Sequence, residues 1–365
     1  VFCLATAKIK EIEYGTFSDL NMIDLSPPPH VANAVGEIHA FIRREVVPIE
    51  RELGERLHNE HTYLREDGRL ASEVLAAQQS VRRQSGNQGL YALHMPKEVG
   101  GGDFSLTDMF FVHEAVYQHG IGASQWMLSW TEGPNQMLMF LNEEQKQRYL
   151  PKIASGELRL QAFGVTEPNT GSDTTQLHTM AVRDKKGYVV NGQKIWTSRA
   201  EYSDLLLLLA RTTPLEKVKS RRHGLSVFLV NMHEVDGLEV RPIRTMINHA
   251  TTELFFSDMR IPADSLIGEE GEGFSYILDG MNAERILIGS ESVGDTRFFI
   301  DRATSYAKER KIFNRPIGQN QGIQFPIARC HASMEAANLM VCKAAALFDA
   351  GLPCGPEANM AKLLA

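Results

Sequence analysis

Cysteine and long apolar runs are scarce in this chain. Only four of its 365 residues are cysteine, and none forms a C-x-x-C pair or a His/Cys cluster with zinc spacing. A disulfide-dense scaffold and a zinc ribbon are therefore excluded, and free thiols in a reducing compartment are expected. The strongest apolar run, Leu205 to Ala210, has the length of a buried strand and is too short to span a membrane.

Basic residues are also fewer than acidic ones: 38 Lys and Arg against 45 Asp and Glu give a formal net charge of -7 at pH 7. This balance argues against a general nucleic-acid binder, so an anionic ligand must meet local cationic groups. Hydrophobic residues make up 43% and charged residues 23% of the chain, as in an ordinary globular protein with two or three domains. We expect a cytoplasmic location, or a mitochondrial or peroxisomal one in a eukaryote.

The two ends of the sequence read differently from the rest. Residues 1–29 are interpreted as an extension outside the fold, since residues 1–21 have no signal-peptide pattern and Met22 looks like a more natural start. The chain stops at Ala365 within a helical pattern, so we interpret the C-terminal domain as incomplete.

Hydrophobic periodicity divides the chain into helical, β and helical regions, at residues 30–157, 158–268 and 269–365. Apolar residues at helical spacing predict a helix from Pro29 to about Arg51, ended or kinked by Pro48. Two long helices are predicted over Tyr276–Ala307 and Gln321–Ala350. Short β-rich segments fill the middle region: 161–165, 180–183, 188–191, 204–211, 225–231, 238–242 and 253–259.

The segment from Ala162 to Asp173 is a loop of small residues with many hydrogen-bonding groups. Some 20 residues later, Gly192–Ser198 presents a single tryptophan, Trp196, followed by two hydroxyls. A polar loop with a lone indole and hydroxyls suits a flat ring with polar edges, since the indole supplies a stacking face. The simpler alternatives are a tight turn and a core tryptophan on a strand.

These segments resemble the two flavin-binding stretches of the acyl-CoA dehydrogenase family, the first at every fixed position of the pattern V-T-E-P-x-x-G-S-D. A third segment, Lys308 to Gly318 with Asn320 and Gln321, resembles the motif through which one subunit reaches the adenosine diphosphate part of FAD held by its neighbour. The family usually has Phe-Gly where this chain has Phe313-Asn314, and Asn tolerates the left-handed backbone. Taken alone, the third segment is equally typical of a charged helix end.

The resemblance implies an α+β multi-domain fold: a helical N-terminal domain, a middle β-barrel domain and a C-terminal helical bundle. It also implies a set of FAD-binding residues. They are Phe163, Val165, Thr166, Gly171, Ser172, Trp196, Thr197, Ser198, Arg310, Phe313 and Gln321.

The catalytic base is assigned to Glu284. Removing the α-proton of a thioester needs a carboxylate in a dry site. In much of the family this Glu lies near the C-terminus, but in the isovaleryl- and long-chain-specific branches it lies on a long helix, just before an Arg. Glu284 precedes Arg285 and stands 26 positions before Arg310, which matches the helix-borne base. A surface or salt-bridged Glu is the alternative.

The resemblance further implies α,β-dehydrogenation of an acyl-CoA thioester, with hydride passing to flavin N5 and electrons leaving to an electron-transfer flavoprotein. Ser172, Asn282 and Arg285 would contact the substrate, and the subunits would form a homodimer or homotetramer. Two alternatives remain open: an acyl-CoA oxidase or flavin monooxygenase of the same fold, and a non-catalytic acyl-CoA-binding homologue.

A few other residues were considered for roles near the site. Ser129, Trp130 and Gly133-Pro134-Asn135 either border the acyl pocket or pack in the core. The histidines in helical context are interpreted as packing or surface residues; they are His39, His113 and His119.

Overall fold

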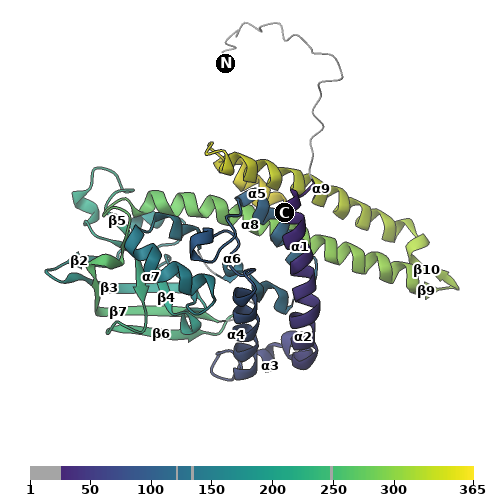
Figure 1. Ribbon diagram of the computed structural model, residues 1–365, viewed down its shortest axis with the longest axis horizontal. Helices are drawn as coiled ribbons and strands as arrows, with labels where there is room; N and C mark the ends of the chain where they lie inside the picture. The colour runs from purple at the N-terminus through teal and green to yellow at the C-terminus, as the bar shows by residue number, and fades with distance from the viewer. Residues whose placement is uncertain (1–25, 121, 133–134, 247–249) are drawn as a thin grey trace, which may run out of the picture.

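The computed structural model describes residues 26–120, 122–132, 135–246 and 250–365. Helices, a β-sheet and further helices follow one another along the chain (Figure 1). The predicted extension at 1–21 and the pair Gly133-Pro134 lie outside the described residues. No helix in the described ranges combines the length and apolar character that a membrane span requires.

The N-terminal region is helical, as its periodicity predicts. Its α-helices are α1 (Pro29–Phe41), α2 (Val47–Leu53), α3 (Glu60–Tyr63), α4 (Ser72–Asn87), α5 (Leu106–Tyr117), α6 (Ser129–Glu132) and α7 (Glu143–Ala154). Pro48 does not end the first helix. A π-helical turn at Ile42–Val46 joins α1 to α2 and places Pro48 in the first turn of α2, where its missing N–H is tolerated.

The middle region forms one eight-stranded sheet in the order β6-β7-β3-β2-β4-β5-β8, with β1 paired to β4. No ladder joins β6 to β8 among the described strands, so the barrel is open. The strands are β1 (Leu160–Gly164), β2 (Met180–Arg183), β3 (Gly187–Ser198), β4 (Leu205–Arg211), β5 (Leu225–Asn231), β6 (Leu238–Ile243), β7 (Thr251–Pro262) and β8 (Leu266–Ile267).

Strand β4 shows why this sheet is apolar on both faces. Its odd-numbered leucines, 205, 207 and 209, pack with α7, while Leu206, Leu208 and Ala210 pack with β3 and β7 on the other face. Alternating side chains therefore enter two separate clusters. This explains the uninterrupted run of leucines that the sequence shows.

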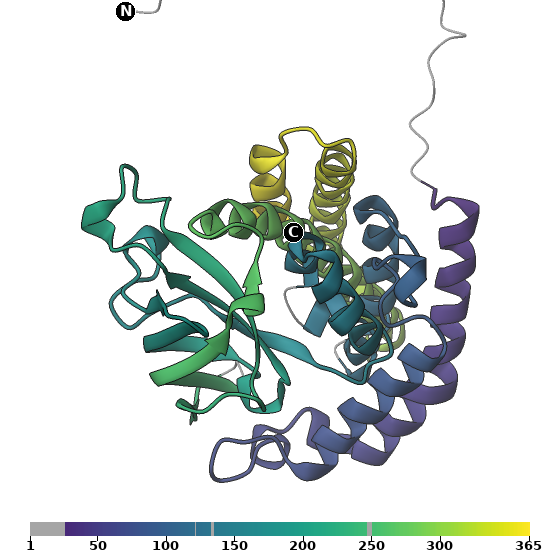
Figure 2. The ribbon, with the colours of Figure 1, turned by 60° about the vertical axis from the view of Figure 1, so that its left-hand side comes forward.

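Three helices complete the chain: α8 (Gly273–Glu309), α9 (Gln321–Asp349) and α10 (Gly355–Leu364). The distal halves of α8 and α9 extend away from the rest and are joined by the short strands β9 (Lys311–Ile312) and β10 (Arg315–Pro316) (Figure 1). The other half of α8 lies between the sheet and the helices (Figure 2). It contacts α5, α9, α10 and β5.

Helices α5 and α8 meet at Gly294. A Cβ added there would lie 2.5 Å from the carbonyl oxygen of Glu114 and 2.9 Å from Cβ of Tyr117. The glycine therefore permits a backbone approach that no larger residue allows. This approach sets the position of the last turn of α5 against the middle of α8.

Substitution of Gly294 by Ala is expected to destabilise the protein by about 1–3 kcal/mol, because it overpacks the α5–α8 contact. The measurement is the free energy of unfolding in urea. Gly322→Ala is the matched control. That glycine is also helical, but an added Cβ would meet nothing within 4 Å. The control is expected to be neutral or stabilising, since alanine is the better helix former. Equal effects of the two changes would contradict this account.

Candidate active site

A β-bulge in β3 presents Trp196. Between Lys194 and Thr197 the register of β3 against β7 shifts by one residue. Trp196 lies within this shift with a φ of 63°, in the left-handed region that an L-residue rarely adopts. The indole is 56% exposed. A bulge that turns a large aromatic ring outward is typical of a binding site, because the strain persists only where the surroundings impose it.

The two hydroxyls after Trp196 point to different environments. Thr197 is buried, and its Oγ1 has no hydrogen-bond partner among the described residues. Ser198 is partly exposed. Successive residues of a strand face opposite ways, so the structure brings Ser198, and not Thr197, to the accessible side.

The first predicted segment continues from β1 into a turn. Phe163, Val165 and Thr166 are partly buried, and Gly171 and Ser172 are exposed. Thr166 accepts a hydrogen bond from the backbone N–H of Ile195 at 2.9 Å. The two predicted flavin segments are thus adjacent in space.

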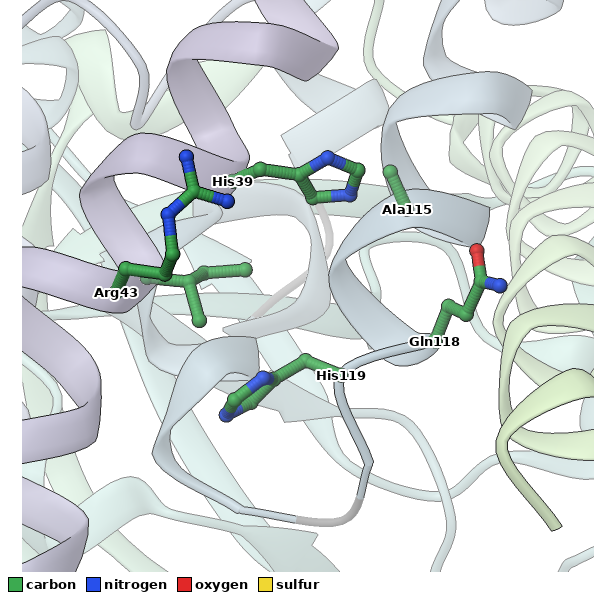
Figure 3. A pocket seen from close by; sticks show the side chains of 6 residues that line it. His39, Arg43, Ala115, Gln118 and His119 are labelled. Carbon is green, nitrogen blue, oxygen red and sulfur yellow. The ribbon is translucent and has the colours of Figure 1, made fainter. Parts of the chain in front are cut away.

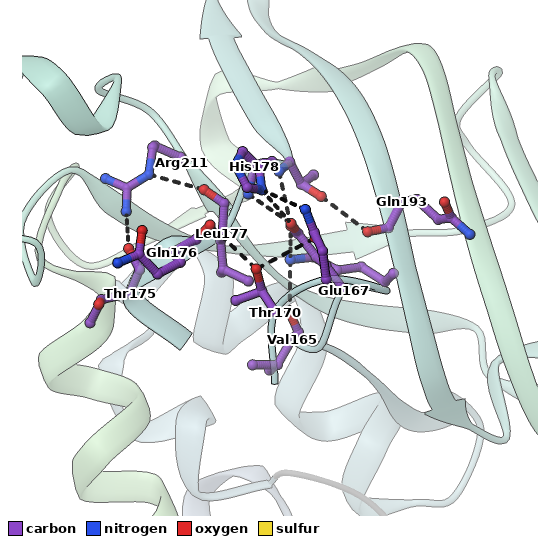
Figure 4. Close-up of polar contacts among 12 residues, drawn as sticks. Val165, Glu167, Thr170, Thr175, Gln176, Leu177, His178, Gln193 and Arg211 are labelled. Carbon is purple, nitrogen blue, oxygen red and sulfur yellow. Dashed lines mark hydrogen bonds and ion pairs between the residues drawn. The ribbon is translucent and has the colours of Figure 1, made fainter. Parts of the chain in front are cut away.

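A buried ion pair joins these segments side chain to side chain (Figure 4). Lys194 Nζ lies 2.9 Å from Glu167 Oε1 and donates a second hydrogen bond to the carbonyl of Val165, also at 2.9 Å. Glu167 accepts two more bonds, from the backbone N–H groups of His178 and Thr179. The carboxylate therefore holds both the turn and the strand that precedes Trp196. Neither charged residue belongs to the site residues predicted from the sequence.

Burial and charge act in opposite directions on this pair. Burial tends to raise the pKa of Glu167, but the charge of Lys194 and the hydrogen bonds from Thr179 and His178 outweigh it and leave the pKa below its usual value. Burial lowers the pKa of Lys194 to about 8, against the opposing effect of Glu167. Each charge is tolerated in this dry position because the other is present.

Arg211, at the end of β4, supports the same region. Its guanidinium is buried and donates to the carbonyls of Leu177 and Thr175, at 3.3 and 2.7 Å (Figure 4). These bonds hold the chain that leaves the 162–173 loop.

Glu284 lies on α8 in a partly buried position. Burial, followed by the negative charge of Glu291, raises the pKa of Glu284 to about 7. The carboxyl group makes no hydrogen bond or ion pair within the described part of the chain. Within the same turn, Arg285 donates a hydrogen bond to Asn282 Oδ1 at 3.0 Å. A dry, unpaired carboxyl with this pKa has the properties of a general base.

The end of the Trp196 segment is linked to this part of α8. The N–H of Arg199 donates to the carbonyl of Ala250 at 2.6 Å. Ala250 is buried in the same apolar cluster as Ala283 and Ile286, the neighbours of Glu284 on α8. The end of the Trp196 segment and the Glu284 turn of α8 thus border one large apolar cluster.

The third predicted segment lies apart from these residues, at the tip of the α8–α9 projection. Arg310 and Gln321 are exposed, and Phe313 is 95% exposed. Phe313 and Asn314 both have positive φ, at 51° and 59°, as the tight β9–β10 turn requires. Within one chain, the structure does not bring this segment to the others.

Among the pockets of the helical region, two lie beside residues singled out from the sequence. One, of about 230 Å³, lies between α1, the π-helical turn and α5, next to His39, Arg43 and His119, and no predicted site residue lines it (Figure 3). The other, of about 420 Å³, is lined by Trp130 and His94 among apolar side chains. The tryptophan borders this cavity and also packs against the apolar core, so its place at the acyl pocket stays a prediction.

Two of the three histidines singled out from the sequence contact a carboxylate. His119 Nε2 lies 2.9 Å from Glu50, and His113 Nδ1 lies 3.2 Å from Glu291. His39 is exposed beside Arg43, and partial burial, then Arg43 and His119, lower its pKa.

Substitution of Glu167 by Gln is expected to destabilise the protein by about 3 kcal/mol, because it leaves the buried Lys194 without its counter-charge. The double variant with Lys194→Met is expected to recover part of that loss. Urea unfolding measures both. Glu239→Gln is the control, because the exposed pair of Glu239 with Arg241 contributes about 1 kcal/mol or less. A loss no larger than that of the control would contradict the proposed weight of the buried pair.

The chain matches known proteins over almost its whole described length. Residues 33–157, 162–259 and 271–365 match, in turn, the N-terminal, middle and C-terminal domain models of acyl-CoA dehydrogenase. An acyl-CoA dehydrogenase of Bacillus subtilis (strain 168) is 35% identical over 287 residues, which cover 78% of this chain and 74% of that protein.

Solved structures agree with this assignment. Butyryl-CoA dehydrogenase of Megasphaera elsdenii superposes with a TM-score of 0.77 at 25% identity, covering 94% of this chain and 85% of that one. A chain in the structure of an electron transferring flavoprotein of Acidaminococcus fermentans reaches 0.78 at 26% identity, with the same coverage of 94% and 85%. The chain therefore belongs to the acyl-CoA dehydrogenase family, whose members are FAD-dependent oxidoreductases acting on CH–CH groups.

Proposed function

We propose that this protein oxidises an acyl-CoA thioester to the trans-2-enoyl-CoA, with FAD as cofactor and Glu284 as the base. The observation that carries the proposal is the state of Glu284. Its carboxyl group is partly buried, has no partner in the described ranges and has a pKa raised to about 7. Its neighbours Ala283 and Ile286 belong to the same large apolar cluster as Ala250, which accepts a hydrogen bond from Arg199 just after the Trp196 segment.

A raised pKa makes Glu284 a stronger base than an ordinary carboxylate while leaving much of it ionised near neutral pH. The α-proton of a thioester is weakly acidic, so the acceptor must be both basic and unsolvated. Glu284 is thus suited to take this proton on a carboxylate oxygen.

The bulged strand and the adjoining loop are the proposed flavin site. The exposed indole of Trp196 supplies a stacking face, and the Ser198 hydroxyl faces the accessible side. The residues proposed to hold the ring edge are Phe163, Val165, Thr166, Gly171 and Ser172, together with the backbone of Thr197, whose side chain faces the buried side of the strand. FAD, when bound, supplies the hydride acceptor at N5.

The substrate side of the site is proposed to include Ser172, Asn282 and Arg285. Arg285, the residue after the base, is held by its hydrogen bond to Asn282. A guanidinium in a fixed position can meet the negative charge of CoA, which the overall acidic surface would otherwise repel.

The segment at the α8–α9 tip is proposed to complete the FAD site of a second subunit. Arg310, Phe313 and Gln321 project from the body of the chain and are exposed. A homodimer or homotetramer would bring Arg310 to the FAD pyrophosphate, where a guanidinium forms strong charge-assisted hydrogen bonds. An electron-transfer flavoprotein is the proposed electron acceptor, in keeping with the similarity to a chain in such a structure.

Glu284→Gln is expected to lower the rate of anaerobic flavin bleaching by an acyl-CoA at least 100-fold, because the amide cannot accept the proton. FAD content should stay unchanged. In the parent protein kcat/KM should rise with pH and level off above about pH 7, as Glu284 loses its proton. Asp301→Asn, an exposed carboxylate on the same helix, is the control. Unchanged bleaching in Glu284→Gln would refute the assignment. Rapid reoxidation of the reduced protein by air would point to an oxidase.

Arg310→Ala is expected to weaken FAD retention roughly tenfold, because it removes a charge-assisted hydrogen bond to the cofactor of the neighbouring subunit. Bound flavin is measured by absorbance after gel filtration, together with the oligomeric state. Lys311→Ala removes a neighbouring exposed cation and should leave FAD content unchanged. Equal losses in both variants would show that only general charge, and not this guanidinium, matters.

A further inference from the structure

A row of carboxyl groups continues along α8 beyond the proposed base. Glu291 and Asp295 follow Glu284 by seven and eleven residues, which is about two and three turns of helix, so all three lie on one face. All three are partly exposed, and Ile288 between them is exposed. Glu291 lies about 10 Å from Glu284 along the helix axis.

Two polar side chains of α5, one buried and one partly buried, lie near Glu291. His113 Nδ1 lies 3.2 Å from Glu291 Oε1, and the histidine side chain is 0% exposed. The other ring nitrogen, Nε2, is buried and has no partner among the described residues. Tyr117 is the second: burial, then the charge of Glu291, raises its pKa well above the usual value. The close contact at Gly294 holds both against α8.

Asp295 extends the polar character of this region. Its Oδ1 is buried without a hydrogen-bond partner in the described ranges, and burial, then Glu291, raises its pKa to about 6. Arg199, which follows the Trp196 segment, is close enough for its charge to affect Tyr117. The region beyond Glu284 therefore contains several polar groups beside the exposed Ile288, and some of them have no partner among the described residues.

An alkyl chain lying along this face would remove water from Glu291 and Asp295 and give them no hydrogen bond in return, which is costly. A hydroxyl group would restore one. A carboxylate oxygen can accept more than one hydrogen bond, so Glu291 retains acceptor capacity beside His113.

We propose that Glu291, supported by His113 and Tyr117, forms the polar end of the acyl site and selects an acyl-CoA whose acyl group has a hydroxyl on its distal part. This inference rests on the proposed function. The acyl chain is proposed to run from Glu284 along the face of α8 that carries the exposed Ile288 and then Glu291. The hydroxyl donates to the Glu291 carboxylate.

The test compares 8-hydroxyoctanoyl-CoA with octanoyl-CoA, using kcat/KM for flavin reduction and turnover with an artificial acceptor. The parent protein is expected to prefer the hydroxylated substrate roughly tenfold or more. Glu291→Leu should abolish or reverse the preference, because it removes the acceptor. Glu291→Gln should keep part of it, since the amide oxygen still accepts. Asp301→Asn, on the same helix but exposed, should behave as the parent.

The ratio of the two kcat/KM values isolates specificity. Any effect of Glu291 on the base would change kcat/KM for both substrates by the same factor and leave the ratio unchanged. FAD content and the unfolding transition check that each variant is folded. Equal kcat/KM values in the parent protein, or a preference that survives Glu291→Leu in a folded, FAD-containing variant, would overturn this inference alone. Failure of both substrates to reduce bound FAD would instead refute the proposed function.

Discussion

The arrangement of the candidate site depends on the buried ion pair between Glu167 and Lys194. The two residues belong to separate segments of the sheet domain, and each would be unstable in a dry position without the other. Their contact, with the backbone bond between Ile195 and Thr166, brings the loop after β1 against the bulge of β3. The outward position of Trp196, with its unfavourable backbone angle, is maintained by these neighbours.

The second constraint is the packing of α8 between the sheet and the helices. One helix carries apolar residues toward α5, α9 and α10, while a single face carries Glu284, Glu291 and Asp295. Burial raises the pKa of Glu284, and the nearby negative charge of Glu291 adds to this effect. The same helix therefore packs in the core and carries a row of carboxyl groups. Because packing removes water from Glu284, the packing of the fold also sets the pKa of the proposed base.

Much of this was predictable from local patterns. The order of helical, β and helical regions, the long helices α8 and α9 and most strands follow from hydrophobic periodicity and from Gly and Pro positions. Family membership followed from three short motifs in the right order and is confirmed by the matched domains. Pro48 was expected to end or kink the first helix, and the helix does not end there, because a π-helical turn precedes the proline and such turns leave no clear local signal.

The sequence by itself determined the succession of elements, the family and the residue types available for chemistry, since these depend on neighbours along the chain. Tertiary structure alone decided which of them meet. The partnership of Glu167 with Lys194, the opposite orientations of Thr197 and Ser198, and the approach of His113 to Glu291 each join groups or faces that sequence spacing does not relate. The raised pKa of Glu284 is likewise a property of its surroundings, because desolvation arises only when distant segments pack together.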